Sequence, residues 1–112
     1  QQWRDFIGLA DVVRAIAWCT EARSLPSGTY NLSSGSSTTV RTLAELIQDR
    51  VTARTGRRPT LTAPPPVDPD PAPYVVDPGR LAAAGFAAEQ PLADAVDEVI
   101  DLCVAITAGA DA

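Results

Sequence analysis

Apolar residues recur at offsets of three and four residues in three stretches of the chain, which is the spacing of one helix face. The first stretch predicts a helix of about fourteen residues. Its apolar stripe consists of Leu9, Val12, Val13, Ile16 and Thr20. The second stretch predicts a helix that ends near Gly56, and the third predicts a helix from Leu92 to about Ile106.

Local signals set the ends of these helices. Thr38 or Thr39 can cap the second helix, because a hydroxyl there accepts a hydrogen bond from a free backbone N–H. The dipeptide Asp77-Pro78 predicts the start of a further short helix, with the aspartate as the cap and the proline at the first helical position. That helix should run through Ala84 and stop at Gly85.

Three short stretches rich in β-branched or aromatic residues predict strands, at 3–7, 29–32 and 60–62. The order of elements is therefore strand, helix, strand, helix, strand, loop, helix, helix. This order predicts an α/β fold with a small, mainly parallel sheet and flanking helices. We expect a single domain over 1–112, with a stiff proline-rich loop at 63–73.

Composition excludes some functions and favours a compartment. The net charge is −5 and no basic stripe is present, which argues against nucleic-acid binding. No apolar run approaches the roughly 20 residues of a membrane span. Cys19 and Cys103 fall in apolar helical patterns without metal-type spacing, so we expect buried thiols in a reducing, cytoplasmic setting, with a disulfide as the alternative.

The chain has few groups able to perform catalysis. It contains no histidine and all nine cationic side chains are arginine, so a Ser-His-Asp or Cys-His site is impossible. The glycines of a dinucleotide fingerprint are also missing. The serine-rich loop at 33–37 precedes a predicted helix and suits a phosphate through its backbone N–H groups, but an ordinary solvated turn explains it too.

Charged residues supply the candidate binding groups. Arg4 has a planar fork that matches phosphate or carboxylate, although an internal ion pair with Asp5 or Asp11 explains it equally well. Asp70 lies in the proline-rich loop and is suited to accept hydrogen bonds from hydroxyl groups, or is simply solvated. The carboxylates around it match no calcium loop, so we expect no metal site.

Five pieces of the chain, in order, resemble the NAD-dependent epimerase/dehydratase family, the extended short-chain dehydrogenase/reductases. Residues 4–12 (R-D-F-I-G-L-A-D-V), 28–35 (G-T-Y-N-L-S-S-G) and 39–47 (T-V-R-T-L-A-E-L-I) resemble three successive segments of that family. The stretches 74–77 and 81–86 resemble a fourth and a fifth. The similarity covers nearly the whole chain and corresponds to the C-terminal, substrate-binding portion of such enzymes.

The resemblance implies a role in binding a nucleotide sugar. Arg4 would contact the phosphates, Asp70 the ribose hydroxyls, and Tyr74 would line the same wall. Asp11, in the same segment as Arg4, is grouped with these substrate-binding residues. In the family a preceding domain binds NAD(P) and supplies a Tyr-x-x-x-Lys pair, and the C-terminal portion packs against it.

Three departures from the family separate this chain from its enzymes. The family usually has an arginine about three residues before the ribose-binding acid, whereas this chain has Pro66 and Val67 there. Gly8 stands where the family has histidine or an aromatic residue. Neither Tyr30 nor Tyr74 is followed by a lysine four residues on. We therefore expect no catalytic residue and no cofactor bound by this chain alone.

Two functional hypotheses follow. The first is the substrate-binding portion of an NAD-dependent nucleotide-sugar epimerase or dehydratase, not catalytic by itself. The second is a free-standing, degenerate domain that binds a small molecule or a protein partner. A pure interaction domain and a small enzyme with new chemistry have no positive signal. In either main case an apolar face that packs on no second domain predicts pairing of two copies.

Overall fold

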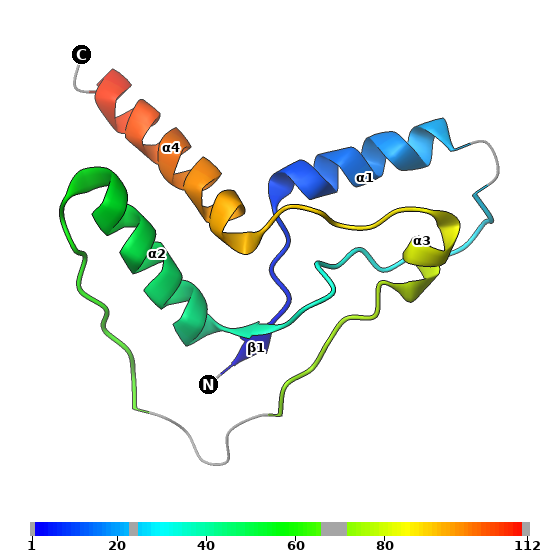
Figure 1. Cartoon of the computed structure of the whole chain (residues 1–112), viewed down its shortest axis with the longest axis horizontal. Coiled ribbons are helices and arrows are strands. Elements are labelled where there is room, and N and C mark those ends of the chain that lie inside the picture. Colours follow the sequence, from blue (N-terminus) through cyan, green and yellow to red (C-terminus); the bar gives the residue numbers. More distant parts are fainter. Residues whose placement is uncertain (1, 23–24, 66–71, 111–112) are drawn as a thin grey trace.

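The computed structural model of the protein describes residues 2–22, 25–65 and 72–110. Four helices account for most of the regular structure: α1 (Leu9–Glu21), α2 (Val40–Thr55), α3 (Gly79–Ala84) and α4 (Leu92–Ala110). Two strands of two residues each, β1 (Trp3–Arg4) and β2 (Thr38–Thr39), pair antiparallel, with Trp3 opposite Thr39. Figure 1 shows α2 and α4 side by side, with α1 and α3 on the other side of the molecule.

The predicted α/β fold with a parallel sheet is wrong, because the described chain is mainly helical and its one small sheet is antiparallel. Of the predicted strand at 3–7, two residues form β1. The stretches 29–32 and 60–62 have no regular structure. A strand needs a hydrogen-bonded neighbour, and β-branched residues alone do not supply one.

The helix ends follow the local signals. Thr39 Oγ1 accepts a hydrogen bond from the N–H of Thr42 at 3.0 Å, which confirms the predicted cap of α2. Gly56 and Gly85 end α2 and α3 in the left-handed conformation, with φ of 72° and 115°. α3 begins at Gly79 rather than at Pro78, but Asp77 still accepts a hydrogen bond from the N–H of Gly79.

The two sides of the molecule have different cores. On one side Ala15 of α1, Leu81 of α3 and Phe86 form a buried cluster. Trp18, Tyr30 and Leu32 pack against this cluster and are partly buried. On the other side α2 contributes no buried residue, and Val96 and Ile100 are the buried apolar side chains of α4.

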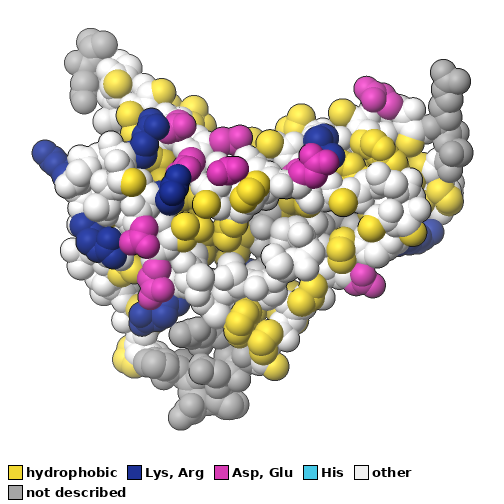
Figure 2. All heavy atoms as spheres, in the orientation of Figure 1, with side chains coloured by type: hydrophobic (Ala, Val, Ile, Leu, Met, Phe, Trp, Pro, Cys, Tyr) yellow, Lys and Arg dark blue, Asp and Glu magenta, His cyan; other side chains and the backbone are white. Residues whose placement is uncertain are grey.

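The molecule is less compact than a typical domain of its length and exposes apolar side chains to solvent. The radius of gyration is 17.3 Å and the molecule measures 49 × 46 × 18 Å, whereas a compact domain of this length has a radius near 13 Å. The apolar stripe predicted on α1 faces solvent, since Leu9, Val13 and Ile16 are 71%, 58% and 61% exposed. Side chains of both charges gather over α2 and α4 in Figure 2, with apolar ones spread between and beyond them.

Both cysteines are free and exposed, which corrects the expectation of buried thiols. Cys19 and Cys103 lie on α1 and α4, where the faces that carry them are covered by no other described element. Within the described ranges, no helix is long and apolar enough to cross a bilayer.

Candidate functional site

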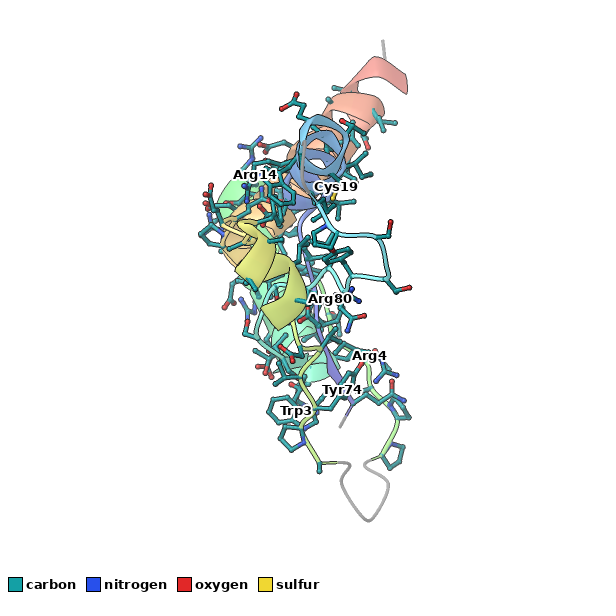
Figure 3. The ribbon with its side chains drawn as sticks, turned by 90° about the vertical axis from the view of Figure 1, so that its right-hand side faces the viewer. Trp3, Arg4, Arg14, Cys19, Tyr74 and Arg80 are labelled. Atoms are coloured by element: carbon teal, nitrogen blue, oxygen red, sulfur yellow. The ribbon has the colours of Figure 1, made fainter. Side chains whose placement is uncertain are left out.

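The candidate site lies at the end of the molecule that carries β1. Arg4 is exposed there, and its guanidinium donates to the carbonyl oxygen of Trp3 at 2.7 Å and to Gln2 Oε1 at 3.2 Å. Tyr74 is 46% exposed. Figure 3 shows Trp3, Arg4 and Tyr74 at the same end of the molecule. The predicted ribose contact, Asp70, lies outside the described residues.

Two hydrogen bonds tie three distant segments together at this end. Asp5 Oδ1 accepts from the N–H of Ser34 at 2.9 Å, which joins β1 to the serine-rich loop. Ser33, which is 4% exposed, donates through Oγ to the carbonyl oxygen of Val76 at 2.9 Å. The loop is thus held between the end of β1 and the segment after Tyr74.

The serine-rich loop uses its own side chains to satisfy its backbone. Gly35 donates its N–H to Ser33 Oγ and Ser36 donates its N–H to Ser34 Oγ, each at 3.3 Å. Ser34 Oγ in turn donates to the carbonyl oxygen of Ser36 at 2.9 Å. These N–H groups already donate to serine hydroxyls, so a phosphate bound here would first require the serine side chains to turn away.

Two polar atoms near this loop lack a protein partner. Asp5 Oδ2 and Ser37 Oγ are both buried, and neither atom forms a hydrogen bond with a described residue. A buried polar atom without a partner costs roughly 1–3 kcal/mol, which makes a water or ligand donor favourable there. Sequence reasoning selected Arg4 as a binding residue and did not select Asp5. The position of Asp5 directly after Arg4 was the signal that could have pointed to it.

Asp11 is the most thoroughly satisfied carboxylate of the described chain. It is 3% exposed, and its oxygens accept hydrogen bonds from the N–H of Glu89 at 3.1 and 3.2 Å and of Gln90 at 2.9 Å. Arg14 donates to it at 3.0 Å and to the carbonyl oxygen of Ala87 at 2.6 Å. Both carboxylate oxygens of Asp11 therefore accept hydrogen bonds from within the protein. The contact of Asp11 with a substrate stays a prediction.

These contacts set the ionisation of Asp11. Burial by itself raises the pKa of the carboxyl group, but the hydrogen bonds from Gln90, Glu89 and Arg14 outweigh it and hold the pKa below its ordinary value. The carboxylate therefore fastens α1 to the segment between α3 and α4. Gly8 contributes to the same contact, since a Cβ there would come within 1.8 Å of Gln90 Oε1. The glycine at position 8 is thus explained by the close approach of Gln90.

No cluster of three or more potential metal ligands exists in the part of the chain that the structure describes. The hydroxyl groups near Arg4 belong to serines, to Thr38 opposite it in the sheet and to Tyr74, and the sequence contains no histidine or lysine that could activate them as nucleophiles. The arrangement is suited to binding through hydrogen bonds and one cation.

No protein-family model, curated protein or solved structure shows significant similarity to the chain. The resemblance to the epimerase/dehydratase family therefore rests on the sequence motifs alone.

Proposed function

We propose that the chain is a substrate-binding portion of an NAD-dependent nucleotide-sugar epimerase/dehydratase-like protein, which binds the diphosphate end of its ligand and is not catalytic alone. The observation that supports this is the meeting of three motif segments at one end of the molecule. Asp5 is bonded to Ser34 and Ser33 to Val76, which leaves Arg4 and Tyr74 exposed beside them. NAD(P) belongs to the proposed parent family rather than to this chain.

The chemistry of the exposed groups suits such a ligand. Arg4 is anchored by two hydrogen bonds to neighbouring acceptors and keeps further N–H groups, because a guanidinium carries five. Those N–H groups can form charge-assisted hydrogen bonds to phosphate oxygens. Tyr74, which is exposed at the same end of the molecule, presents a ring and a hydroxyl. The proposal does not depend on the predicted parallel sheet.

The alternative is a free-standing, degenerate domain that binds a small molecule or a protein partner. The extensive self-bonding of the serine-rich loop favours it, because those N–H groups are already used within the protein. The two proposals differ in whether a nucleoside diphosphate is recognised.

Calorimetric titration with a panel of nucleoside diphosphates and nucleotide sugars tests the proposal. We expect saturable binding that weakens about tenfold or more when Arg4→Ala removes a charge-assisted contact. Arg57→Ala is the matched control, since Arg57 follows α2 at the end away from β1 and its loss changes the net charge equally. If the wild type and the Arg4→Ala variant bound the nucleotide with equal affinity, Arg4 would not have the phosphate-binding role proposed for it.

A titration with NAD is the second test. We expect no measurable NAD binding and no turnover of any sugar nucleotide by the purified 112-residue chain, because the Tyr-x-x-x-Lys pair is missing from the sequence. Saturable NAD binding in the micromolar range, or turnover with nothing else added, would contradict the proposal.

We also propose that two copies pair through the exposed apolar side chains of α1 (Leu9, Val13, Ile16) and of α4 (Val99, Leu102, Ile106). The accessible surface is 7976 Å², whereas a compact monomer of this mass exposes about 5,900 Å². The excess of roughly 2,000 Å² is within what one chain buries in an obligate dimer. We expect a dimer in sedimentation velocity, weakened by Ile16→Glu or Leu102→Glu, and a wild-type monomer at high concentration would contradict it.

A cytoplasmic location completes the proposal. Two exposed, unpaired cysteines are typical of a reducing compartment.

A further inference from the structure

A hollow lies beside α3, apart from the end that carries Arg4. It has a volume of about 630 Å³, within the range of roughly 300–1,000 Å³ typical of small-molecule sites. Among the described residues its walls are mostly apolar and its one charged group is Arg80. The described lining residues are Trp18, Ala22, Leu25, Pro26, Tyr30, Arg80, Ala83 and Ala84. Figure 1 places α3 on the side of the molecule opposite to α2, and in Figure 3 Arg80 lies nearer the middle of the molecule than Trp3 and Tyr74 do.

The floor of this hollow is part of the packed core. Trp18 lies against Phe86 with ring centroids 5.8 Å apart, and both Trp18 and Tyr30 pack on the buried cluster of Ala15, Leu81 and Phe86. The Tyr30 hydroxyl donates to the carbonyl oxygen of Pro26. A ligand would therefore meet aromatic walls that are already held in place, which reduces the entropy lost on binding.

Arg80 is fixed in position without being neutralised. Its guanidinium lies over the ring of Tyr30, 4.7 Å from the centroid, and donates through Nη1 to the carbonyl oxygen of Thr29 at 2.9 Å and through Nη2 to that of Ser27 at 3.4 Å. These contacts use two of the five N–H groups. Five arginines have a carboxylate partner within 4.0 Å among the described residues, and Arg80 is not one of them.

Gly28 makes this arrangement possible. Its φ of 142° is in the region that favours glycine, and a Cβ there would lie 2.6 Å from Arg80 Nη2. A methyl group at position 28 would therefore push the guanidinium off its two carbonyl acceptors. Gly28 therefore lets the guanidinium of Arg80 lie close to the backbone.

We propose that this hollow binds a small apolar monocarboxylate, with the carboxylate on Arg80 and the apolar body against Trp18 and Tyr30. A planar guanidinium that keeps several N–H groups matches a carboxylate by paired, charge-assisted hydrogen bonds. The alanines of α3 leave room for the body of the ligand, because their side chains end at Cβ. This site is separate from the one proposed for a nucleotide sugar and does not depend on it.

Calorimetric titration with 2-naphthoate, compared with the neutral 2-naphthamide, tests the proposal on the full chain. We expect saturable binding of the carboxylate and at least roughly tenfold weaker binding of the amide, since one charge-assisted contact is lost. Arg80→Gln should abolish the difference between the two probes. Arg57→Gln, which removes the same charge elsewhere, should leave both affinities unchanged.

Two further variants keep Arg80 and address the rest of the site. Gly28→Ala should weaken 2-naphthoate binding by displacing the guanidinium, and Ala83→Leu should weaken both probes by filling the hollow. Arg4→Ala should leave 2-naphthoate binding unchanged, which separates this site from the nucleotide site. Equal binding of the two probes by the wild type, no saturable 2-naphthoate binding at millimolar concentration, or indifference to both Arg80→Gln and Ala83→Leu would overturn the proposal.

Discussion

Around Phe86, α1 and α3 share a closed apolar cluster, whereas α2 and α4 are joined by half-exposed ion pairs beside the buried Val96 and Ile100 of α4. In the first region Ala15, Leu81 and Phe86 are 3–4% exposed, and Asp11 is buried with every oxygen bonded. In the second region Arg50 donates through Nε to Asp97 Oδ1 at 2.7 Å and through Nη2 to Oδ2. Arg54 and Asp101 add a pair at 2.6 Å.

The difference shows two ways to join helices in a small chain. Apolar burial and a satisfied buried carboxylate give a stabilisation that salt barely affects. Exposed ion pairs contribute little in water and are screened by salt, so they serve more to set the alignment of α2 on α4 than to hold them. We therefore expect the Phe86 region to unfold last, and we expect the stability of the α2–α4 contact to depend on salt and pH.

Removal of the central aromatic ring should have the largest effect. Phe86→Ala deletes the side chain that Ala15, Leu81 and Trp18 surround, and we expect a loss of about 3 kcal/mol in the free energy of unfolding. Ile100→Ala in α4 is the matched truncation in the other region, with an expected loss of about 2 kcal/mol. Urea denaturation measures both, and a larger loss for Ile100→Ala would reverse the comparison.

Asp11→Asn should come next, with a loss of roughly 2 kcal/mol, because the amide supplies one acceptor where a carboxylate accepted several charge-assisted bonds. The pKa of Asp11 is lowered in the folded protein, so its contribution is present above the carboxyl's ordinary pKa and is lost as the pH falls through the folded value.

Urea denaturation between neutral pH and about pH 3 checks this dependence, because an ordinary aspartate pKa is near 3.9. The wild type should lose more stability on acidification than the Asp11→Asn variant does. Asp49→Asn, which alters an exposed carboxylate paired with Arg58, is the control and should follow the wild type. Parallel curves for the wild type and the Asp11→Asn variant would show that the buried carboxylate does not govern acid stability.

The smallest effect is expected at the α2–α4 ion pair. Arg50→Ala should lower the melting temperature less than either change above, and the difference from the wild type should vanish in about 1 M salt, where the screening length is about 3 Å. The hydrogen bonds and charge of Arg50 lower the pKa of Asp97, so acidification should also remove the difference. A melting difference that persists in high salt would mean that Arg50 acts through packing instead.

Local chemistry accounts for the parts of the fold that the sequence predicted well. The Thr39 cap, the stop of α2 at Gly56 and the stop of α3 at Gly85 were all predicted, because each depends on a hydroxyl or a positive φ within one turn. Periodicity predicted α4 from Leu92 to about Ile106, and the helix continues to Ala110. Of the candidate site, Arg4 and Tyr74 were found at one end of the molecule, whereas Asp5 Oδ2 and Arg80 were missed.

By itself the sequence determined where the helices lie and several of their ends, and that the chain lacks histidine and lysine, since caps, periodicity and composition act over a few residues. Only the tertiary structure decided which face of α1 is covered. Asp11, Ala15 and Trp18 turn toward residues 86–90, while the more apolar Leu9, Val13 and Ile16 stay exposed. Periodicity defines a helix face, but its burial depends on hydrogen bonds and contacts made with residues far along the chain.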